Sequence, residues 1–146
     1  MSTHLEELAA VVDNEIAPNA MYVDREGEYP RANIEALQAA GLFGLVSSTD
    51  VGGQGAGIRA ATEVVGEIAR HCASTAMIVC MHYAATAVIE AHGSEVLRRD
   101  IAANHHLTTL AFSEAVSRSH FRHPCRPRGR TQETATRSIS TPRNPG

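Results

Sequence analysis

The stretch STAMIVCMHYAATAVIEA, residues 74–91, decides the fold of this 146-residue chain. It is apolar nearly all round, and its polar residues His82, Thr86 and Glu90 stand at i, i+4 and i+8, on one narrow stripe of a helix. A helix that is hydrophobic over most of its surface is normally covered by other helices. We therefore predict a buried helix over 74–91 inside an all-α domain, with other helices wrapped around it.

An amphipathic helix is predicted at the amino terminus. Thr3 and Glu6 have the form of a capping box. Pro18 is expected to end this helix, because proline lacks the N–H that a helix interior uses. The inward stripe recurs at helical spacing and consists of Leu5, Leu8, Ala9, Val12 and Ile16.

Three further helices complete a predicted five-helix bundle within residues 3–103. One begins at Pro30, which suits a first helical position, and stops at Gly41, where a left-handed residue is needed. The next covers residues 58–72, and a short last helix follows Ser94 as its N-cap. Residues 44–57 are rich in Gly, Ser and Asp and are predicted to form a loop.

The glycine-rich run GGQGAG at 52–57 invites comparison with phosphate-binding loops. A dinucleotide-binding fingerprint would place its third glycine at position 58, where the chain has Ile58, and no lysine follows for a P-loop. A tight turn that leads into the next helix is therefore the favoured interpretation.

The residue composition changes after the predicted helices. Residues 107–112, LTTLAF, are rich in Thr and Phe and predict one β-strand. Residues 122–146 consist largely of Arg, Pro, Ser and Thr, with Ile139 as the single aliphatic residue, and predict a disordered tail. The expected organisation is thus a helical domain over 1–106, the first strand and turn of an incomplete β-domain over 107–121, and the tail.

Charge is distributed unevenly along the chain. Residues 1–114 hold 6 Arg against 15 Asp and Glu, a balance of −9, whereas residues 115–146 hold 7 Arg against Glu133 alone, a balance of +6. A basic tail can be a nucleic-acid arm. Such arms usually mix Lys with Arg and stacking aromatics, but this chain has no Lys and the tail region offers only Phe121. No nucleic-acid partner is predicted.

Membrane and secretory classes are not favoured either. The first residues contain no basic residue and no apolar run, unlike a signal peptide. The most apolar stretch, residues 73–88, is interrupted by His82 and Thr86 and is shorter than the ~20 residues of a bilayer span. The chain is expected to be soluble and cytoplasmic, without a membrane partner.

No metal site is predicted. The three cysteines Cys72, Cys80 and Cys125 match neither a disulfide framework nor a zinc pattern. Cys80 and His82 do not have metal-ligand spacing, and the adjacent pair at positions 105 and 106 has no recognisable partners. A buried His82 paired with Glu90 is expected to be structural.

An ordered set of residues runs along the chain, and its members are Ala17-Pro18, Asp24, Pro30, Leu37, Gly41, Gly44, Gly52-Gly53-x-Gly55, Ser74-Thr75-Ala76, Gly93 and Ala111-Phe112-Ser113-Glu114. In this order and spacing, the set resembles the all-helical amino-terminal domain of acyl-CoA dehydrogenases as it runs into the first strand of their middle β-domain. The resemblance covers about residues 5–121.

The resemblance implies an FAD-dependent oxidoreductase that removes two hydrogens from the carbons next to an acyl-CoA thioester. In that family a carboxylate takes the α-proton while the β-hydride passes to the flavin, and the protein supplies orientation and polarisation. The catalytic Glu belongs to the last helical domain, so no catalytic residue is assigned within this chain. A complete member is expected to be a homo-oligomer with electron-transfer flavoprotein as its acceptor.

The same resemblance assigns the cofactor and thioester contacts to the predicted strand and turn. Leu110, Phe112 and Ser113 are expected to border the flavin, and Ser119 to meet the thioester end of the substrate. Departures from the family motif, above all Arg118 where glycine is usual, are expected to alter this turn. A strand-end polar residue is the alternative interpretation of Ser113.

The acyl end of the substrate is assigned to the helix over 74–91. Met77, Cys80 and Met81 fall where family members line the end of the acyl pocket, together with Ala76. They are small or flexible, which suits a fatty chain. Helix–helix core is the alternative interpretation of each one.

Three hypotheses on function follow. The chain is a truncated or frame-disrupted acyl-CoA dehydrogenase that is inactive alone, since its Arg- and Pro-rich tail is what a GC-rich gene yields in a shifted frame. Alternatively, it is a stand-alone helical interaction module that binds a partner through its apolar fourth helix. A third hypothesis is a half-enzyme completed by a second chain.

Overall fold

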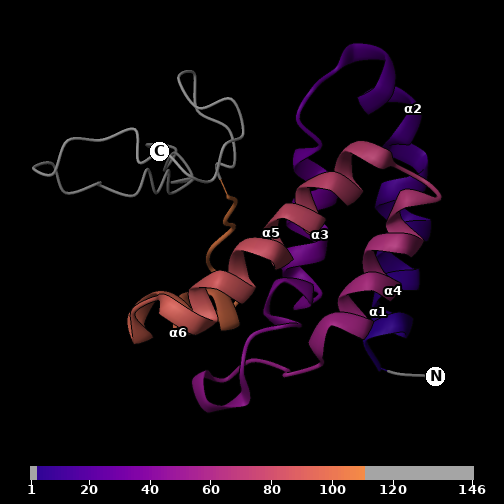
Figure 1. Cartoon of the computed structure of the whole chain (residues 1–146). Coiled ribbons are helices and arrows are strands. Elements are labelled where there is room, and N and C mark those ends of the chain that lie inside the picture. The colour runs from indigo at the N-terminus through magenta and orange to yellow at the C-terminus, as the bar shows by residue number, and fades with distance from the viewer. Residues whose placement is uncertain (1–2, 111–146) are drawn as a thin grey trace, which may run out of the picture. The chain divides into compact units, whose positions relative to one another are not determined.

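The computed structural model describes residues 3–110, which form helices joined by short turns (Figure 1). The α-helices are α1 (Thr3–Val11), α2 (Ala17–Glu26), α3 (Arg31–Ala39), α4 (Gly57–Ala69), α5 (Ala73–His92) and α6 (Glu95–Ala102). A π-helical turn, Val12–Ile16, joins α1 to α2 without a break. Residues 3–110 therefore form five helical rods, which confirms the predicted all-α five-helix bundle.

Pro18 does not end the first helix, contrary to the prediction. It lies at the start of α2, directly after the π-helical turn, inside a continuous helix. The π-helical turn directly before it is wider, and the N–H of Ala17 there donates to the carbonyl of Val12, five residues back. This extra width makes room for the proline ring next to the preceding turn, which is where a proline inside a helix normally clashes.

The wide turn also keeps the buried residues of this helix in line. Leu8, Val12 and Ile16 are buried, and Ala20 packs against the same core. They repeat every four residues, and in a regular α-helix such a repeat drifts by about 40° per step around the helix. One π-helical turn cancels most of that drift, so the apolar stripe stays on the core side.

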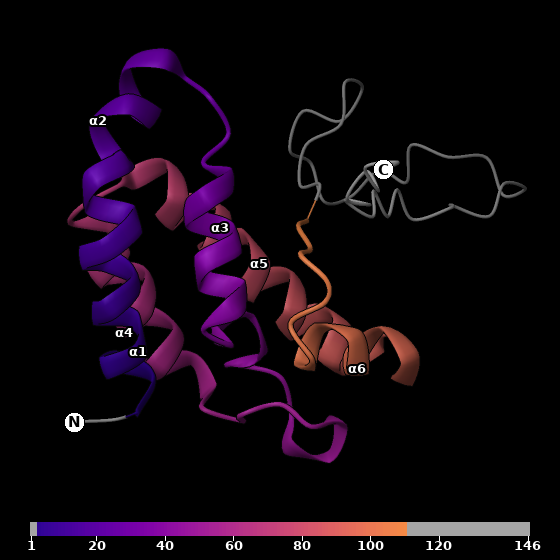
Figure 2. The ribbon, with the colours of Figure 1, turned by 180° about the vertical axis from the view of Figure 1, so that it is seen from behind.

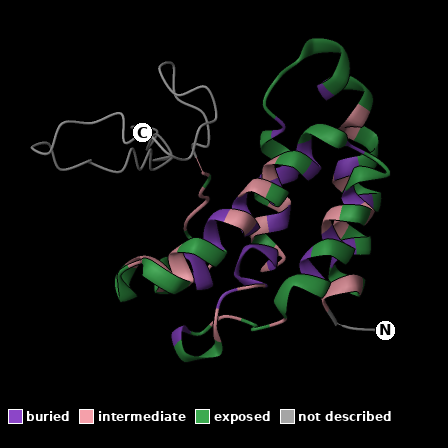
Figure 3. Cartoon of the chain, viewed as in Figure 1, coloured by how far each residue is buried: buried purple, intermediate pink, exposed green. Residues whose placement is uncertain are grey.

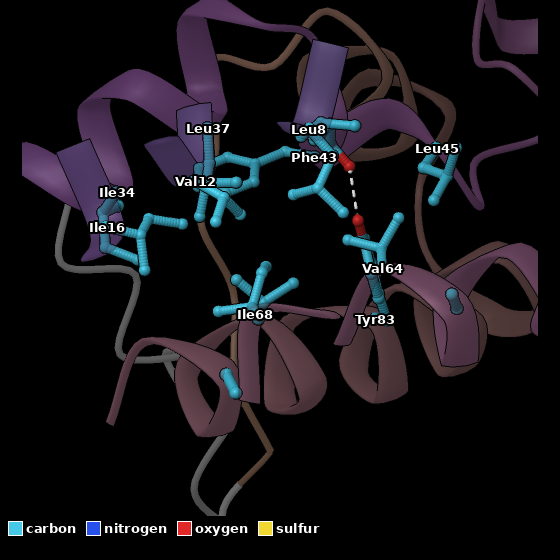
Figure 4. Packing of buried hydrophobic residues seen from close by; sticks show 14 of the residues in the cluster. Leu8, Val12, Ile16, Ile34, Leu37, Phe43, Leu45, Val64, Ile68 and Tyr83 are labelled. Atoms are coloured by element: carbon cyan, nitrogen blue, oxygen red, sulfur yellow. Dashed lines mark hydrogen bonds between the residues drawn. The ribbon is translucent and has the colours of Figure 1, made fainter. Parts of the chain in front are cut away.

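The core lies between the α1–α2 helix, α3, α4 and one side of α5 (Figure 4). Leu8, Val12 and Ile16 from the first helix face Leu37 of α3 and Ile68 of α4 in this close view. The 3-10 turn Leu42–Gly44 contributes Phe43, which is 1% exposed. Because the protein has no Trp, this core is built mainly from aliphatic side chains of several helices.

A chain of buried polar groups ties three helices together. Asn19 of α2 donates to the Asn33 side chain of α3 at 3.2 Å, and Asn33 donates to the hydroxyl of Thr75 in α5 at 2.9 Å. Thr75 in turn donates to the sulfur of Cys72 at 3.2 Å. Because each member has a partner, the polar groups are buried without the cost of lost hydrogen bonds, and they fix how these helices meet.

The loop between α3 and α4 is closed by its own backbone. The N–H groups of residues 53–56 donate in turn to the carbonyls of Ser48, Gly44, Ser47 and Leu45 at 2.8–3.0 Å. Gly53 lies so close to Ser47 that a Cβ there would stand 2.3 Å from the Ser47 carbonyl oxygen. These amides are already used by the protein, so the loop is a structural turn, as the glycine spacing indicated, and offers no cradle for a phosphate.

The predicted strand over 107–112 does not form in the part that the structure describes. Residues 107–110 follow α6 without regular secondary structure, and the remaining residues of the predicted strand, 111 and 112, lie outside the described range. A strand needs a hydrogen-bonded neighbour, and residues 3–110 contain no strand to pair with. The compact unit extends to Leu110. The divisions proposed for 107–121 and 122–146 stay predictions.

Candidate functional site

Helix α5 is buried on one side only, which corrects the prediction that other helices wrap around it (Figure 3). The opposite side carries an apolar stripe, defined as Met77, Met81, Ala84 and Val88, of which Met81 and Ala84 are half-buried. These residues stand at i, i+4, i+7 and i+11 and therefore lie on one line along the helix. Met77 is 63% exposed and Val88 is 45% exposed. The sequence composition could not show this, because it does not reveal that the neighbouring elements pack mainly on one side of α5.

The buried side of α5 is locked by polar contacts to the turn at 42–44. The hydroxyl of Tyr83 donates to the carbonyl of Leu42 at 2.8 Å, a bond drawn in Figure 4. The Nε2 atom of His82 lies 3.1 Å from the carbonyl oxygen of Phe43. Thr86 donates to the backbone carbonyl of His82 at 2.8 Å. The bonds of Tyr83 and His82 to the turn set the rotation of α5 and so determine which of its residues face outward, whereas the Thr86 bond lies within the helix.

The segment after α6 returns beside α5 and is tied to the bundle (Figures 1 and 2). Asn104 adopts a left-handed conformation with φ of 62°, and its side-chain oxygen accepts from the N–H of Gly44 at 3.0 Å. Gln38 donates to the Asn104 carbonyl at 2.6 Å. Further along, the N–H of Thr108 donates to Nδ1 of His82 at 3.2 Å. Leu110 comes two residues later.

His82 is therefore structural, as predicted, but its partners differ from the prediction. Its ring contacts Phe43 and Thr108 rather than Glu90, whose carboxylate is bound by Arg98 of α6 at 2.8 Å. Burial away from water disfavours the charged ring and lowers the pKa of His82 from 6.5 to about 4, although the bond to the Phe43 carbonyl opposes this shift. The nearby His106 lowers the pKa further.

This lowered pKa predicts a loss of stability in mild acid. Between pH 6.5 and about 4 the unfolded chain binds a proton at His82 that the folded chain does not, so the stability that this residue contributes is fully present above pH 6.5. It should fall progressively as the pH drops to 4, by up to about 3 kcal/mol. Urea unfolding at a series of pH values measures the slope.

Other groups also titrate in this pH range, and a His82→Gln variant supplies the control. The difference between the two pH profiles isolates the histidine. Parallel profiles for the two proteins between pH 6.5 and 4 would contradict the assignment.

The predicted site residues fall into three groups. Met77, Cys80 and Met81 come together on the outward side of α5, Cys80 next to the apolar stripe and exposed, whereas the neighbouring Ala76 is buried in the core. Leu110 is partly buried at the end of the segment that His82 holds. The other three predicted residues, Phe112, Ser113 and Ser119, lie outside the described residues.

Reasoning from sequence missed the residues that connect these places. Gln38, Asn104 and Thr108 each bond to a group far away in the chain, so local spacing gives no hint of the pairing. Asn104 carries one usable signal, since asparagine just after a helix is suited to a left-handed end. Tyr83 offers another, because a buried tyrosine hydroxyl needs a partner.

The apolar stripe contains no ionisable group. Glu90 is the carboxylate of α5, and Arg98 holds it together with Asp50 of the turn Thr49–Val51, at 3.1 Å from both Asp50 oxygens. Within residues 3–110, no three His, Cys, Asp or Glu side chains are grouped so as to hold a metal ion. What the stripe can do chemically is to contact an apolar group, not to move a proton.

Among the described helices, α5 is the one that is long and apolar enough to cross a membrane by length and composition alone. At 20 residues it is longer than the apolar stretch judged from sequence. Core helices of soluble proteins meet the same criterion, and α5 packs along α4 in this structure. The expectation of no membrane partner stays a prediction.

Comparison with known protein families gives one match to this chain. The model described as "Acyl-CoA dehydrogenase, N-terminal domain" matches residues 3–104, which include α1 to α6. The chain therefore belongs to the acyl-CoA dehydrogenase family, as its sequence pattern indicated.

Individual relatives agree with this assignment. The chain is 33% identical over 111 residues to the probable acyl-CoA dehydrogenase fadE25 of Mycobacterium leprae (strain TN), covering 73% of this chain and 28% of the relative. It is 37% identical over 68 residues to the 3-sulfinopropanoyl-CoA desulfinase of Variovorax paradoxus, covering 47% and 17%. The short-chain-specific acyl-CoA dehydrogenase of Clostridium acetobutylicum is 29% identical over 84 residues, covering 57% and 22%. No solved structure matches the chain significantly.

The chain spans between about a sixth and somewhat more than a quarter of the length of these curated relatives. The match to their family covers the helical part of this chain, residues 3–104.

Proposed function

We propose that this chain supplies the acyl-binding helical wall of an FAD-dependent acyl-CoA dehydrogenase, acting in the α,β-dehydrogenation of a fatty or branched acyl-CoA. The apolar stripe of α5 is the observation that carries this proposal. It is apolar and uncharged along its length, and it contains the flexible side chains Met77 and Met81, with Cys80 beside it. Such a surface suits a hydrocarbon chain, because methionine adapts its shape to irregular apolar partners.

Family membership alone does not decide the chemistry. Two similar proteins are named desulfinases, whereas others are named dehydrogenases. Dehydrogenation of a hydrocarbon acyl group is favoured over desulfination by the chemistry of the stripe. A sulfinate carried by the acyl group would be an anion, and the stripe has no cation to receive it.

An acyl chain on this stripe should be displaced by a charge placed on it. We expect Met77→Glu to weaken the binding of a fluorescent long-chain acyl-CoA by about tenfold or more, since full burial of one such side chain contributes about 1.5–3 kcal/mol. Fluorescence titration of the full chain, together with any partner chain that copurifies, measures the dissociation constant.

Val96→Glu is the matched control, because Val96 is 71% exposed on α6 and lies outside the stripe. It should leave acyl-CoA binding unchanged. Equal weakening in both variants would show a non-specific effect of charge and would count against the acyl wall.

Only one of the residues predicted to border the flavin lies within residues 3–110. Leu110 is that residue, and the amides of residues 53–56 in the glycine-rich loop are already bound to carbonyls. FAD would supply the hydride acceptor. The proposed role of residues 3–110 therefore concerns the acyl chain and not the flavin.

We expect that the chain purified alone carries no stoichiometric FAD and does not oxidise acyl-CoA. Micromolar affinity requires a binding free energy of about −8 kcal/mol after the cost of immobilising a large ligand has been met. A small number of contacts to FAD does not reach this value. Proton abstraction also needs a base within about 3 Å of its target, whereas Glu90 of α5 is engaged by Arg98.

The flavin absorbance of the chain is recorded twice, alone and copurified with the product of the downstream reading frame. Bound flavin in the first preparation would refute the expectation. Flavin in the second preparation alone would favour a half-enzyme completed by another chain.

The exposed stripe also favours a second candidate, a helical module that binds a protein partner. The two candidates differ in their ligand. A module would bind a protein partner, and Met77→Glu would weaken that binding. The module would show no affinity for acyl-CoA. The dehydrogenase proposal further includes electron-transfer flavoprotein as acceptor, a homo-oligomer and a cytoplasmic location.

A further inference from the structure

The segment 103–110 is attached to the bundle at two separate places. The first is Asn104, which bonds to Gly44 and Gln38 through amide groups that do not titrate. The second is Thr108, whose backbone N–H reaches the ring of His82. Between and beyond these points the chain has no regular secondary structure. These two attachments, together with Leu107, which packs against the core between them, decide where the residues up to Leu110 lie.

We propose that His82 is a positioning residue that latches residues 108–110 onto α5, and that protonation of its ring releases them. The latch is built from described residues alone and does not depend on the proposed role in acyl-CoA oxidation. Asn104 keeps the start of the segment in place when the latch opens.

Hydrogen-bond chemistry allows a single ring state. The Phe43 carbonyl can only accept, so Nε2 of His82 must carry the hydrogen. The Thr108 N–H can only donate, so Nδ1 must be bare. The neutral ring protonated at Nε2 satisfies both partners. When Nδ1 is also protonated, its N–H faces the N–H of Thr108, and neither group can accept a hydrogen bond. The bond to Thr108 is then lost.

The surroundings give no compensation for a charged ring. On α5, the Tyr83 hydroxyl is committed to the Leu42 carbonyl, and burial raises the pKa of this tyrosine, so it stays neutral. The turn at 42–44 contains no ionisable residue. From the segment itself, His106 opposes a second positive charge.

No buried residue of the neighbouring helices α4 and α6 is ionisable, and Arg98 of α6 is paired with Glu90 and Asp50. The buried residues of α4 and α6 are apolar: Ala60, Ala61, Val64 and Ile68 in α4, and Ile101 and Ala102 in α6. Opening the segment admits water to the ring, so protonation and release favour each other.

The full chain, followed by NMR from pH 7 to about 3, tests the latch, because the pKa of His82 is about 4. The ring signals of His82 report its protonation, and amide exchange corrected for intrinsic rates reports the protection of single N–H groups. The Thr108 amide should lose protection about five- to tenfold, the factor expected of one net hydrogen bond, over the same pH range in which the ring titrates. The Gly44 amide, which donates to Asn104, should keep its protection.

Two outcomes of this titration would overturn the latch. One is a Thr108 amide that stays protected while His82 titrates. The other is simultaneous loss at Thr108 and Gly44, which would mean that the whole bundle opens at once. The titration needs no variant, so the proposal remains testable even if His82 substitutions fail to fold.

Variants separate the two ring nitrogens. His82→Gln keeps a donor that reaches toward the Phe43 carbonyl but offers Thr108 no aligned acceptor, so Thr108 should be poorly protected at pH 7 and insensitive to pH. His106→Gln is the control. It removes the neighbouring positive charge, so release should persist and move to higher pH. Release that disappears in His106→Gln would assign the switch to His106 and overturn the role of His82.

Discussion

Replacing Phe43 by alanine should lower the free energy of unfolding by about 3–5 kcal/mol, the usual cost of removing a buried phenylalanine. The Phe43 side chain is 1% exposed in the turn Leu42–Gly44, and its ring lies 4.8 Å from that of His82. A domain of this size has only about 5–15 kcal/mol in total, so the variant should be close to unfolding. Urea denaturation with a fixed m-value measures the change in midpoint.

Ile58→Ala is the matched control for this experiment. Ile58 is 81% exposed at the start of α4, so its truncation should change stability by less than about 0.5 kcal/mol. Because the hydrogen bond to His82 uses the backbone carbonyl of Phe43, the Phe43 variant removes packing and leaves that bond in place. A loss below about 1 kcal/mol would contradict the burial of Phe43 in the core.

Gly53→Ala is expected to be about as damaging, through the backbone rather than the core. Its new Cβ would meet the carbonyl oxygen of Ser47 at 2.3 Å and the Ser47 Cβ at 2.5 Å, and none of these atoms belongs to a flexible side-chain end. The loop must move apart, and the four hydrogen bonds of residues 53–56 are disturbed. We expect a loss of about 3 kcal/mol or more, measured by thermal unfolding followed by circular dichroism.

The same substitution at Gly66 should have the opposite sign. Gly66 is an exposed position inside α4, and an added Cβ meets nothing within 4 Å. Alanine there should stabilise the protein by about 0.5–1 kcal/mol, because glycine is the poorer helix former. If both glycine variants destabilise equally, crowding against Ser47 is not the cause.

Several helix ends were predictable from local chemistry, although α2 was not foreseen. Ser94 caps α6 as expected, with the Leu97 N–H donating to its hydroxyl at 3.4 Å, and Gly41 ends the turn after α3 with φ of 75°. Such signals act within a few residues, so one sequence displays them. The glycine spacing at 52–57 similarly excluded a nucleotide loop, and the closed backbone of that loop agrees.

The features that needed the structure depend on distant partners. The apolar pattern of α5 could not reveal that the neighbouring elements pack mainly on one side of it, because hydropathy shows what a helix prefers and not what surrounds it. His82 contacts Phe43 across 39 positions and Thr108 across 26, and no spacing rule pairs them. Pro18 was misjudged because a proline normally breaks a regular helix, and the wide turn before it was not foreseen.

That wide turn gives the amino-terminal helix a tolerance to changes in its length. A π-helical turn amounts to one surplus residue whose rotation is absorbed locally, so the residues after it keep their facing. Removing one residue between Val12 and Ile16 would yield a regular helix with Val23 still directed at the core. Evolution can thus add or delete a residue at this point without turning the buried face of the helix to water.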